Sequence, residues 1–149
     1  MVRERARALP AIQDVAPHSI GVTVLDDNDR EENSIILSRG QRLPATVMER
    51  YQTRYDGQTA VKIDVNEGES PVLDYVKQLG SFVLNLPQAR PKGSPIDVRV
   101  ALDLSSIIRV AAIDVGSGEQ KEIEIDYHAN LDEAQMQERA RWIEQQQVS

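Results

Sequence analysis

Turn-forming residues recur along this chain at intervals too short for helices of ordinary length, and this spacing most constrains the fold. Eight short segments of β-type composition lie between the turns: 19–25, 34–38, 47–55, 59–65, 81–86, 96–104, 107–115 and 121–127. The predicted turns are at 26–33, 39–40, 56–57, 67–68, 79–80, 91–95, 105–106 and 116–118. Short strands at near-regular spacing are typical of a sandwich or barrel. We therefore predict a mainly β fold, an antiparallel β-sandwich of about eight strands.

The segment that follows the Asp56-Gly57 turn shows the strand pattern most clearly. Its apolar side consists of alternate residues, Thr59, Val61, Ile63 and Val65, and the residues between them are mostly polar. Such alternation predicts a half-buried strand with one apolar face directed inward. Alternation alone does not say whether that face covers the protein's own core or something that the protein binds.

The pattern changes after His128. Asn130, with Glu133 three residues on, is a variant of the capping box, and good helix formers continue to about Gln146. We expect one amphipathic C-terminal helix on the surface of the sandwich. The predicted organisation is an N-terminal arm (1–13), a sandwich domain (14–128) and a C-terminal helix (129–149).

Composition excludes several classes of function. A chain of 149 residues with a net charge of −7 and no cysteine fits one soluble domain without disulfides or thiolate metal sites. The acidic balance argues against a nucleic-acid partner, and the apolar runs are far too short for a membrane helix. We expect no nucleic acid or membrane as a partner, and a cytoplasmic location, which the lack of cysteine suits.

The chain lacks the residue patterns of an enzyme. Its two histidines, His18 and His128, are far apart, and no pair of histidines has the spacing of metal ligands. The GSG sequence at 116–118 fits a hairpin turn better than a phosphate loop. We therefore predict a non-catalytic chain with no metal and no cofactor of its own.

Several motifs resemble, in the same order, those of one chaperone family. They are DVAPHSIGV (14–22), SIILSRGQRLP (34–44), GQTAVKIDVNEGE (57–69), LGSFVL (79–84), RPKGSPIDVRVALDL (90–104) and SGEQKEIEI (117–125). Together they resemble the substrate-binding domain of the heat shock protein 70 (DnaK-like) chaperones, and NLDEAQM (130–136) resembles the start of the family's lid. The resemblance covers roughly residues 12–146.

The resemblance implies a two-sheet sandwich in which loops at one end form a channel for a short extended peptide. In this family the channel walls bind the peptide backbone, and a central pocket accepts an apolar side chain. The matching positions here are Val22, Val24, Leu25, Tyr51, Val61 and Ile63. Apolar, partly β-branched walls suit an aliphatic side chain. Without the resemblance, the same six residues would be interpreted as ordinary sandwich core.

Two departures from the family's pattern bear on the channel. The family's arch over the peptide pairs the Leu25 position with a small residue, but Arg54 stands there instead, and its stem could narrow the channel. The loop after Leu25 is longer and acidic (26–33). We hypothesise that it favours peptides with flanking Lys or Arg, mainly through steering. The alternative interpretation is an ordinary solvated loop.

The remaining expectations concern partners. The chain lacks the family's nucleotide-binding domain and most of its lid, so we expect it to be a piece of a larger protein in which ATP binds only the missing domain. Expected partners are extended hydrophobic peptides, that domain, co-chaperones and tails captured from other copies. The apolar linker of the family is replaced by Pro10–Gln13, which weakens the case for ordinary ATP coupling. The rival interpretation is an interaction module that has lost peptide capture.

Overall fold

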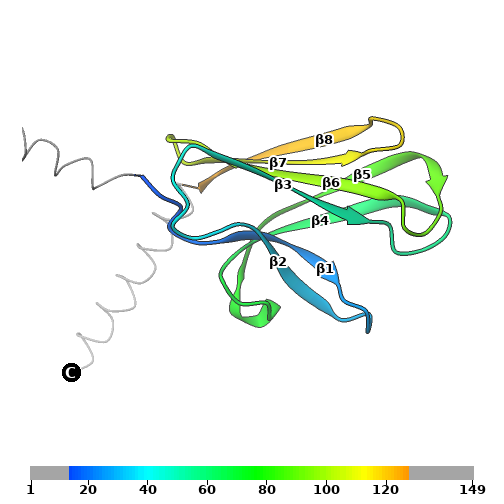
Figure 1. The fold of residues 1–149 in the computed structure, drawn as a ribbon, viewed down its shortest axis with the longest axis horizontal. Coiled ribbons are helices and arrows are strands. Elements are labelled where there is room, and N and C mark those ends of the chain that lie inside the picture. The colour runs from blue at the N-terminus through cyan, green and yellow to red at the C-terminus, as the bar shows by residue number, and fades with distance from the viewer. Residues whose placement is uncertain (1–13, 128–149) are drawn as a thin grey trace, which may run out of the picture.

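The computed structural model describes residues 14–127, which form eight β-strands and one short 3-10 turn (Figure 1). The strands are β1 (Ile20–Leu25), β2 (Glu31–Leu37), β3 (Ala45–Gln52), β4 (Gln58–Glu67), β5 (Lys77–Arg90), β6 (Pro95–Leu102), β7 (Ile107–Asp114) and β8 (Gln120–Asp126), and the turn η2 spans Leu73–Tyr75. The predicted N-terminal arm and C-terminal helix lie outside the described residues. Between residues 14 and 127, no helix is long and apolar enough to cross a membrane.

The strands form two four-stranded antiparallel sheets. Sheet 1 has the order β2-β1-β4-β5 and sheet 2 the order β3-β6-β7-β8. The prediction of a mainly β, two-sheet sandwich of eight strands is confirmed.

Alternating residues of both sheets meet in one hydrophobic core. On β6 the inward residues Ile96, Val98, Val100 and Leu102 are all buried. They pack with inward residues of sheet 1, among them Val22 and Val65. This alternation of apolar and polar residues is what a sandwich requires of each strand.

The acidic loop is shorter than the sequence suggested. β2 begins at Glu31, so the prediction of a loop through Asn33 was wrong for its last three residues. The loop closes early because the Asp26 carboxylate accepts hydrogen bonds from the backbone N–H groups of Asn28 and Arg30, at 2.8 and 2.9 Å. Glu31 and Glu32 then pair with Leu25 and Val24 of β1.

The predicted turn at Leu79-Gly80 was also wrong, because β5 continues through it from Lys77 to Arg90, with only a shift of register against β4 at Leu79. Glycine at this position allows the two sheets to lie close together. A Cβ atom on Gly80 would lie 3.3 Å from the Cδ1 atom of Ile125 on β8. Pro87 is accommodated later in the same edge strand, where residues 86–89 have no pairing partner on β4.

The inward face of β4 begins at Val61, two residues later than alternation predicted. Ile63 and Val65 are buried and Val61 is partly buried, but Thr59 is exposed. The pairing of β4 with β5 shifts register between Gln58 and Ala60, which breaks the alternation at this end. The strand therefore has three inward apolar residues, and Val61 lies nearest the open end.

Candidate functional site

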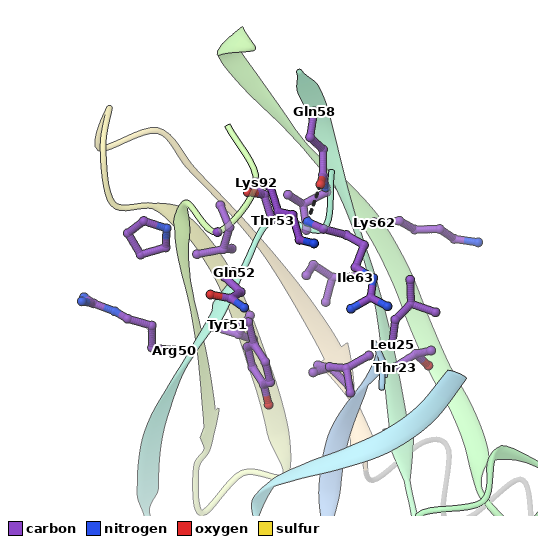
Figure 2. Close-up of a pocket in the computed structure, with 18 of the residues that line it drawn as sticks. Thr23, Leu25, Arg50, Tyr51, Gln52, Thr53, Gln58, Lys62, Ile63 and Lys92 are labelled. Carbon is purple, nitrogen blue, oxygen red and sulfur yellow. Dashed lines mark hydrogen bonds between the residues drawn. The ribbon is translucent and has the colours of Figure 1, made fainter. Parts of the chain in front are cut away.

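A cavity of about 650 Å³ opens between the two sheets at one end of the sandwich (Figure 2). Its walls come from β1 and β4 of sheet 1 and from β3 and β6 of sheet 2. Figure 2 shows Tyr51 on one side of the cavity, with Ile63 and Leu25 on the other. The cavity therefore replaces part of the sandwich core at the end where the β1–β2 and β3–β4 loops lie.

All seven residues that the sequence singled out line this cavity: Val22, Val24, Leu25, Tyr51, Arg54, Val61 and Ile63. Val22 and Ile63 are deep, with exposed fractions of 1% and 5%, whereas Leu25 is 37% exposed and stands at the rim. The structure brings the seven residues together, and their part in binding a ligand remains a prediction.

Two further residues form the floor of the cavity and were missed by sequence reasoning. Ile96 and Val98 of β6 line it and are almost fully buried. Their alternation in the sequence marked them as inward-facing, but the same pattern continues along β6 to Leu102. Nothing in a single sequence indicates which end of such a strand lies beneath a cavity.

The side chain of Tyr51 is oriented by a hydrogen bond between the sheets. Its Oη atom lies 2.8 Å from the Oγ atom of Ser34 on β2. Burial raises the pKa of the Tyr51 hydroxyl above its ordinary value, so the group is neutral at physiological pH. The ring therefore presents an apolar surface to the cavity, while its polar end is satisfied at the edge.

The strands β1 and β4 separate beside the cavity. They pair only from Ile20–Val22 to Val65–Glu67. Beyond Val22, β1 continues to pair with β2, and the earlier part of β4 pairs with β5. Figure 1 shows β1 and β2 turning away from β4 toward their loop. Within the described residues, no ladder joins the facing edges of these two segments.

One side chain organises the β3–β4 loop above the cavity. The Oε1 atom of Gln58 accepts hydrogen bonds from the backbone N–H groups of Arg54 at 2.8 Å and Tyr55 at 3.3 Å. Its Nε2 atom donates to the carbonyl oxygen of Ala60 at 2.9 Å. Gln58 therefore fixes the position of the Arg54 backbone.

The Arg54 side chain crosses from this loop to the β1–β2 loop. Its Nε atom donates to Asp29 Oδ1 at 3.0 Å, and its Nη2 atom donates both to the same carboxylate and to the carbonyl oxygen of Asp26 at 3.0 Å. The hydrogen bond to Asp29 raises the pKa of Arg54. Arg54 therefore forms a polar connection between the two loops, and its narrowing of a peptide channel stays a prediction.

The other charged residues around the cavity differ in their pairing. Arg50 forms an ion pair with Asp97, and Lys62 with Asp64 at 3.8 Å. Figure 2 shows Arg50 and Lys62 pointing away from the cavity in opposite directions. Asp27 and Lys92 also line it, and neither side chain forms an ion pair with another residue in the 14–127 range.

The described residues contain no cluster of three or more His, Asp or Glu side chains that could hold a metal ion. The residues that line the cavity offer apolar contact at its floor, backbone hydrogen bonding along the separated strands, and charge at its rim.

Comparison with known proteins gave one consistent family. The family model described as Hsp70 protein matches residues 5–149. The chain is 38% identical over 113 residues to the chloroplastic stromal 70 kDa heat shock-related protein of Pisum sativum, and 36% identical over 120 residues to the chaperone protein dnaK1 of Synechocystis sp.. These alignments cover 75% and 79% of this chain but only 15% and 17% of the two relatives.

Proposed function

This chain belongs to the Hsp70 family, and from that premise we propose that its sandwich binds extended apolar segments of unfolded proteins, reversibly and without chemistry of its own. The region would act as the substrate-binding part of a longer chaperone. Its ligand would be recognised by one apolar side chain in the cavity and by its main chain.

The observation that carries this proposal is the cavity between the sheets. Its volume of about 650 Å³ lies within the range of roughly 300–1,000 Å³ found for ligand sites. The floor is formed by Val22, Ile63, Ile96 and Val98. Burial of a leucine-sized side chain against such a surface stabilises a complex by about 1.5–3 kcal/mol. That gain alone is smaller than the roughly 4.1 kcal/mol of a millimolar complex, so main-chain hydrogen bonds would have to supply the rest of the affinity.

The separation of β1 and β4 supports the second part of the proposal. An extended segment that enters the cavity would pass the strand edges on either side of Val24 and Val61, which pair with β2 and β5 but not with each other. Free main-chain groups on such edges bind extended peptides through the same hydrogen bonds that join strands. This mode of binding tolerates many ligand sequences, because recognition depends on the ligand's backbone and on only one anchoring side chain.

The wider activity of the parent protein is part of the same proposal. Since the chain spans 15% to 17% of the two relatives described above, control by ATP from a nucleotide-binding domain and delivery by co-chaperones would depend on the rest of the protein. In the 14–127 region, the proposed task is peptide capture alone.

A preference for peptides with basic flanks would rest on fewer acidic residues than the sequence suggested. Asp26 is occupied by the backbone N–H groups of its own loop, and Asp29 by Arg54. Asp27 lines the cavity, and Glu32 lies opposite Val24, on the same face of the sheet. These two carboxylates, together with Glu31, would provide the attraction.

The rival function is an interaction module that no longer captures peptides, and the connection from Arg54 to Asp29 is the observation that favours it. Fluorescence anisotropy separates the two functions. A labelled peptide with a central leucine and uncharged flanks should bind the 149-residue chain saturably, and the same peptide with serine at the centre should bind much more weakly. Equal binding of both peptides, or binding of neither, would contradict peptide capture through the cavity.

A further inference from the structure

Arg54 connects the two loops that border the cavity, and both ends of this connection are well anchored. At one end, the Arg54 backbone N–H donates to Gln58. At the other end, the guanidinium reaches the side chain of Asp29 and the carbonyl oxygen of Asp26. Because Arg54 also lines the cavity, the connection runs across the mouth of the proposed peptide site.

The acceptor loop is organised in advance to receive the guanidinium. The Asp26 carboxylate accepts two backbone hydrogen bonds, and these bonds lower its pKa, chiefly the one from the Arg30 N–H. Asp29 has a φ angle of 61°, and its N–H donates to the Asp26 carbonyl oxygen at 3.1 Å. The Asp29 carboxylate and the Asp26 carbonyl therefore face Arg54 from one compact turn.

We infer that this connection, the Arg54 strap, controls how fast bound segments enter and leave the cavity, by an ion pair that salt can open. The strap consists of the Arg54–Asp29 ion pair and the hydrogen bond from Arg54 to the Asp26 carbonyl. This inference rests on the proposed function, because it assigns a kinetic role to the mouth of the same site.

The exposure of the two partners makes the strap sensitive to ionic strength. The side chain of Arg54 is 29% exposed and that of Asp29 is 68% exposed, so water and ions reach the pair. Screening shortens from about 10 Å at 0.1 M salt to about 3 Å at 1 M. A closure made of apolar side chains would not weaken in this way, since salt does not screen apolar contact. Salt should therefore accelerate both entry and exit of a segment and change its equilibrium affinity less.

The test is the dissociation rate of a labelled leucine-centred peptide with uncharged flanks, measured by adding excess unlabelled peptide to the 149-residue chain. For the unaltered chain we expect the rate to rise about two- to five-fold between about 0.1 M and about 1 M salt, the effect of losing an exposed ion pair. Arg54→Gln and Asp29→Asn should each show the faster rate already at low salt, with little further salt dependence. Asparagine suits Asp29 because it tolerates a positive φ angle.

Arg99→Gln is the matched control. It removes another exposed arginine ion pair, the one with Glu122 within sheet 2, at a residue that does not line the cavity. This variant should keep the rate and salt dependence of the unaltered chain. Variants with unchanged rates at both salt concentrations would overturn the strap while leaving peptide capture intact. Binding that appears only after Arg54→Gln would also overturn it, because the arginine would then exclude segments.

Hydrogen exchange of the Asp29 amide tests the strap without any peptide. Arg54→Gln should speed this exchange, because the strap holds the Asp26 carbonyl that accepts the Asp29 N–H bond. If no peptide binds any variant, the proposed function is contradicted, and so is the role of the strap in the entry and exit of peptides. Exchange of Asp29 that is the same in both proteins would show that the strap does not hold the loop either.

Discussion

The Oγ atom of Ser34 and the Oη atom of Tyr51 lie 2.8 Å apart, and their hydrogen bond joins the two sheets beside the cavity. Ser34 belongs to β2 at the edge of sheet 1, and Tyr51 to β3 at the edge of sheet 2. Each residue faces inward opposite a cavity-lining residue, Val22 and Ile96 respectively. The bond therefore fixes both the spacing of the sheets and the orientation of an aromatic cavity wall.

The two substitutions that remove this bond should have non-additive effects on stability. Tyr51→Phe and Ser34→Ala should each lower the free energy of unfolding by about 1 kcal/mol. Each variant removes one hydroxyl, which breaks the bond and leaves the other hydroxyl without its partner. The double variant should be less destabilised than the sum of the two, with a coupling of at least about 0.5 kcal/mol. Urea denaturation measures all three values. Tyr75→Phe, at a side chain that is 77% exposed, is the control that should change nothing. Additive effects would show that the two hydroxyls do not interact.

The acidic rim should steer peptides by charge. Neutralising Asp27, Glu31 and Glu32 together leaves the hydrogen bonds of Asp26 and Asp29 in place. We expect slower association of lysine-flanked peptides and a weaker salt dependence of that rate, with neutral peptides unaffected. Stopped-flow association at two ionic strengths measures this. Unchanged association of the lysine-flanked peptides would contradict the hypothesis of a basic preference.

A buried ion pair next to the β3–β4 loop should give the fold a measurable acid sensitivity. The Asp114 carboxylate is 1% exposed and accepts hydrogen bonds from Arg90 at 2.7 and 3.0 Å and from Ser117 at 2.7 Å. Burial alone would raise its pKa, but these bonds outweigh burial and lower the pKa from its ordinary value of 3.8. Because Arg90 ends β5 and Asp114 ends β7, the pair links the two sheets.

The sign of the pH dependence follows from that lowered pKa. The stabilisation is complete above 3.8, the value in the unfolded chain, and is lost as pH falls through the lower value of the folded state. Asp114→Asn should lower the free energy of unfolding by about 2–4 kcal/mol at neutral pH. The difference from the unaltered chain should shrink below pH 3.8. Glu122→Gln, which removes an exposed ion pair with Arg99, should cost less than about 1 kcal/mol. A difference that does not vary with pH would contradict the assignment.

The architecture could be predicted because strands and turns alternate regularly, and the two errors have different causes: one is a tertiary contact and the other is the exact length of a local turn. Gly80 has the composition of a turn but lies in a long strand, since a side chain there would crowd Ile125 of the opposite sheet. The contact of Gly80 has no signal in the local sequence. Glu31 has the composition of a loop, but the Asp26 carboxylate closes a local Asx turn before it.

The candidate site was predictable only in part, for a related reason. Alternation identifies Val61 and Ile63 as inward-facing, and the resemblance placed both at a channel. Alternation gives no sign that β1 and β4 separate after Val22, and this separation is what opens a cavity in place of core. The partner of Arg54 was equally hidden, because Asp29 lies in another loop.

The most direct test of peptide capture is to fill the cavity with a larger side chain and to compare peptide binding with that of a variant that carries the same substitution outside the cavity. Val61→Phe places a larger side chain in the cavity, whereas Val83→Phe places it on β5, where Val83 is 40% exposed and lies outside the cavity lining. Urea denaturation should show both variants to be folded. In anisotropy measurements with the leucine-centred peptide, Val61→Phe should weaken binding about ten- to a hundred-fold, the value of burying one aliphatic side chain, and Val83→Phe should not. Equal affinity of the two folded variants would contradict the cavity as the binding site.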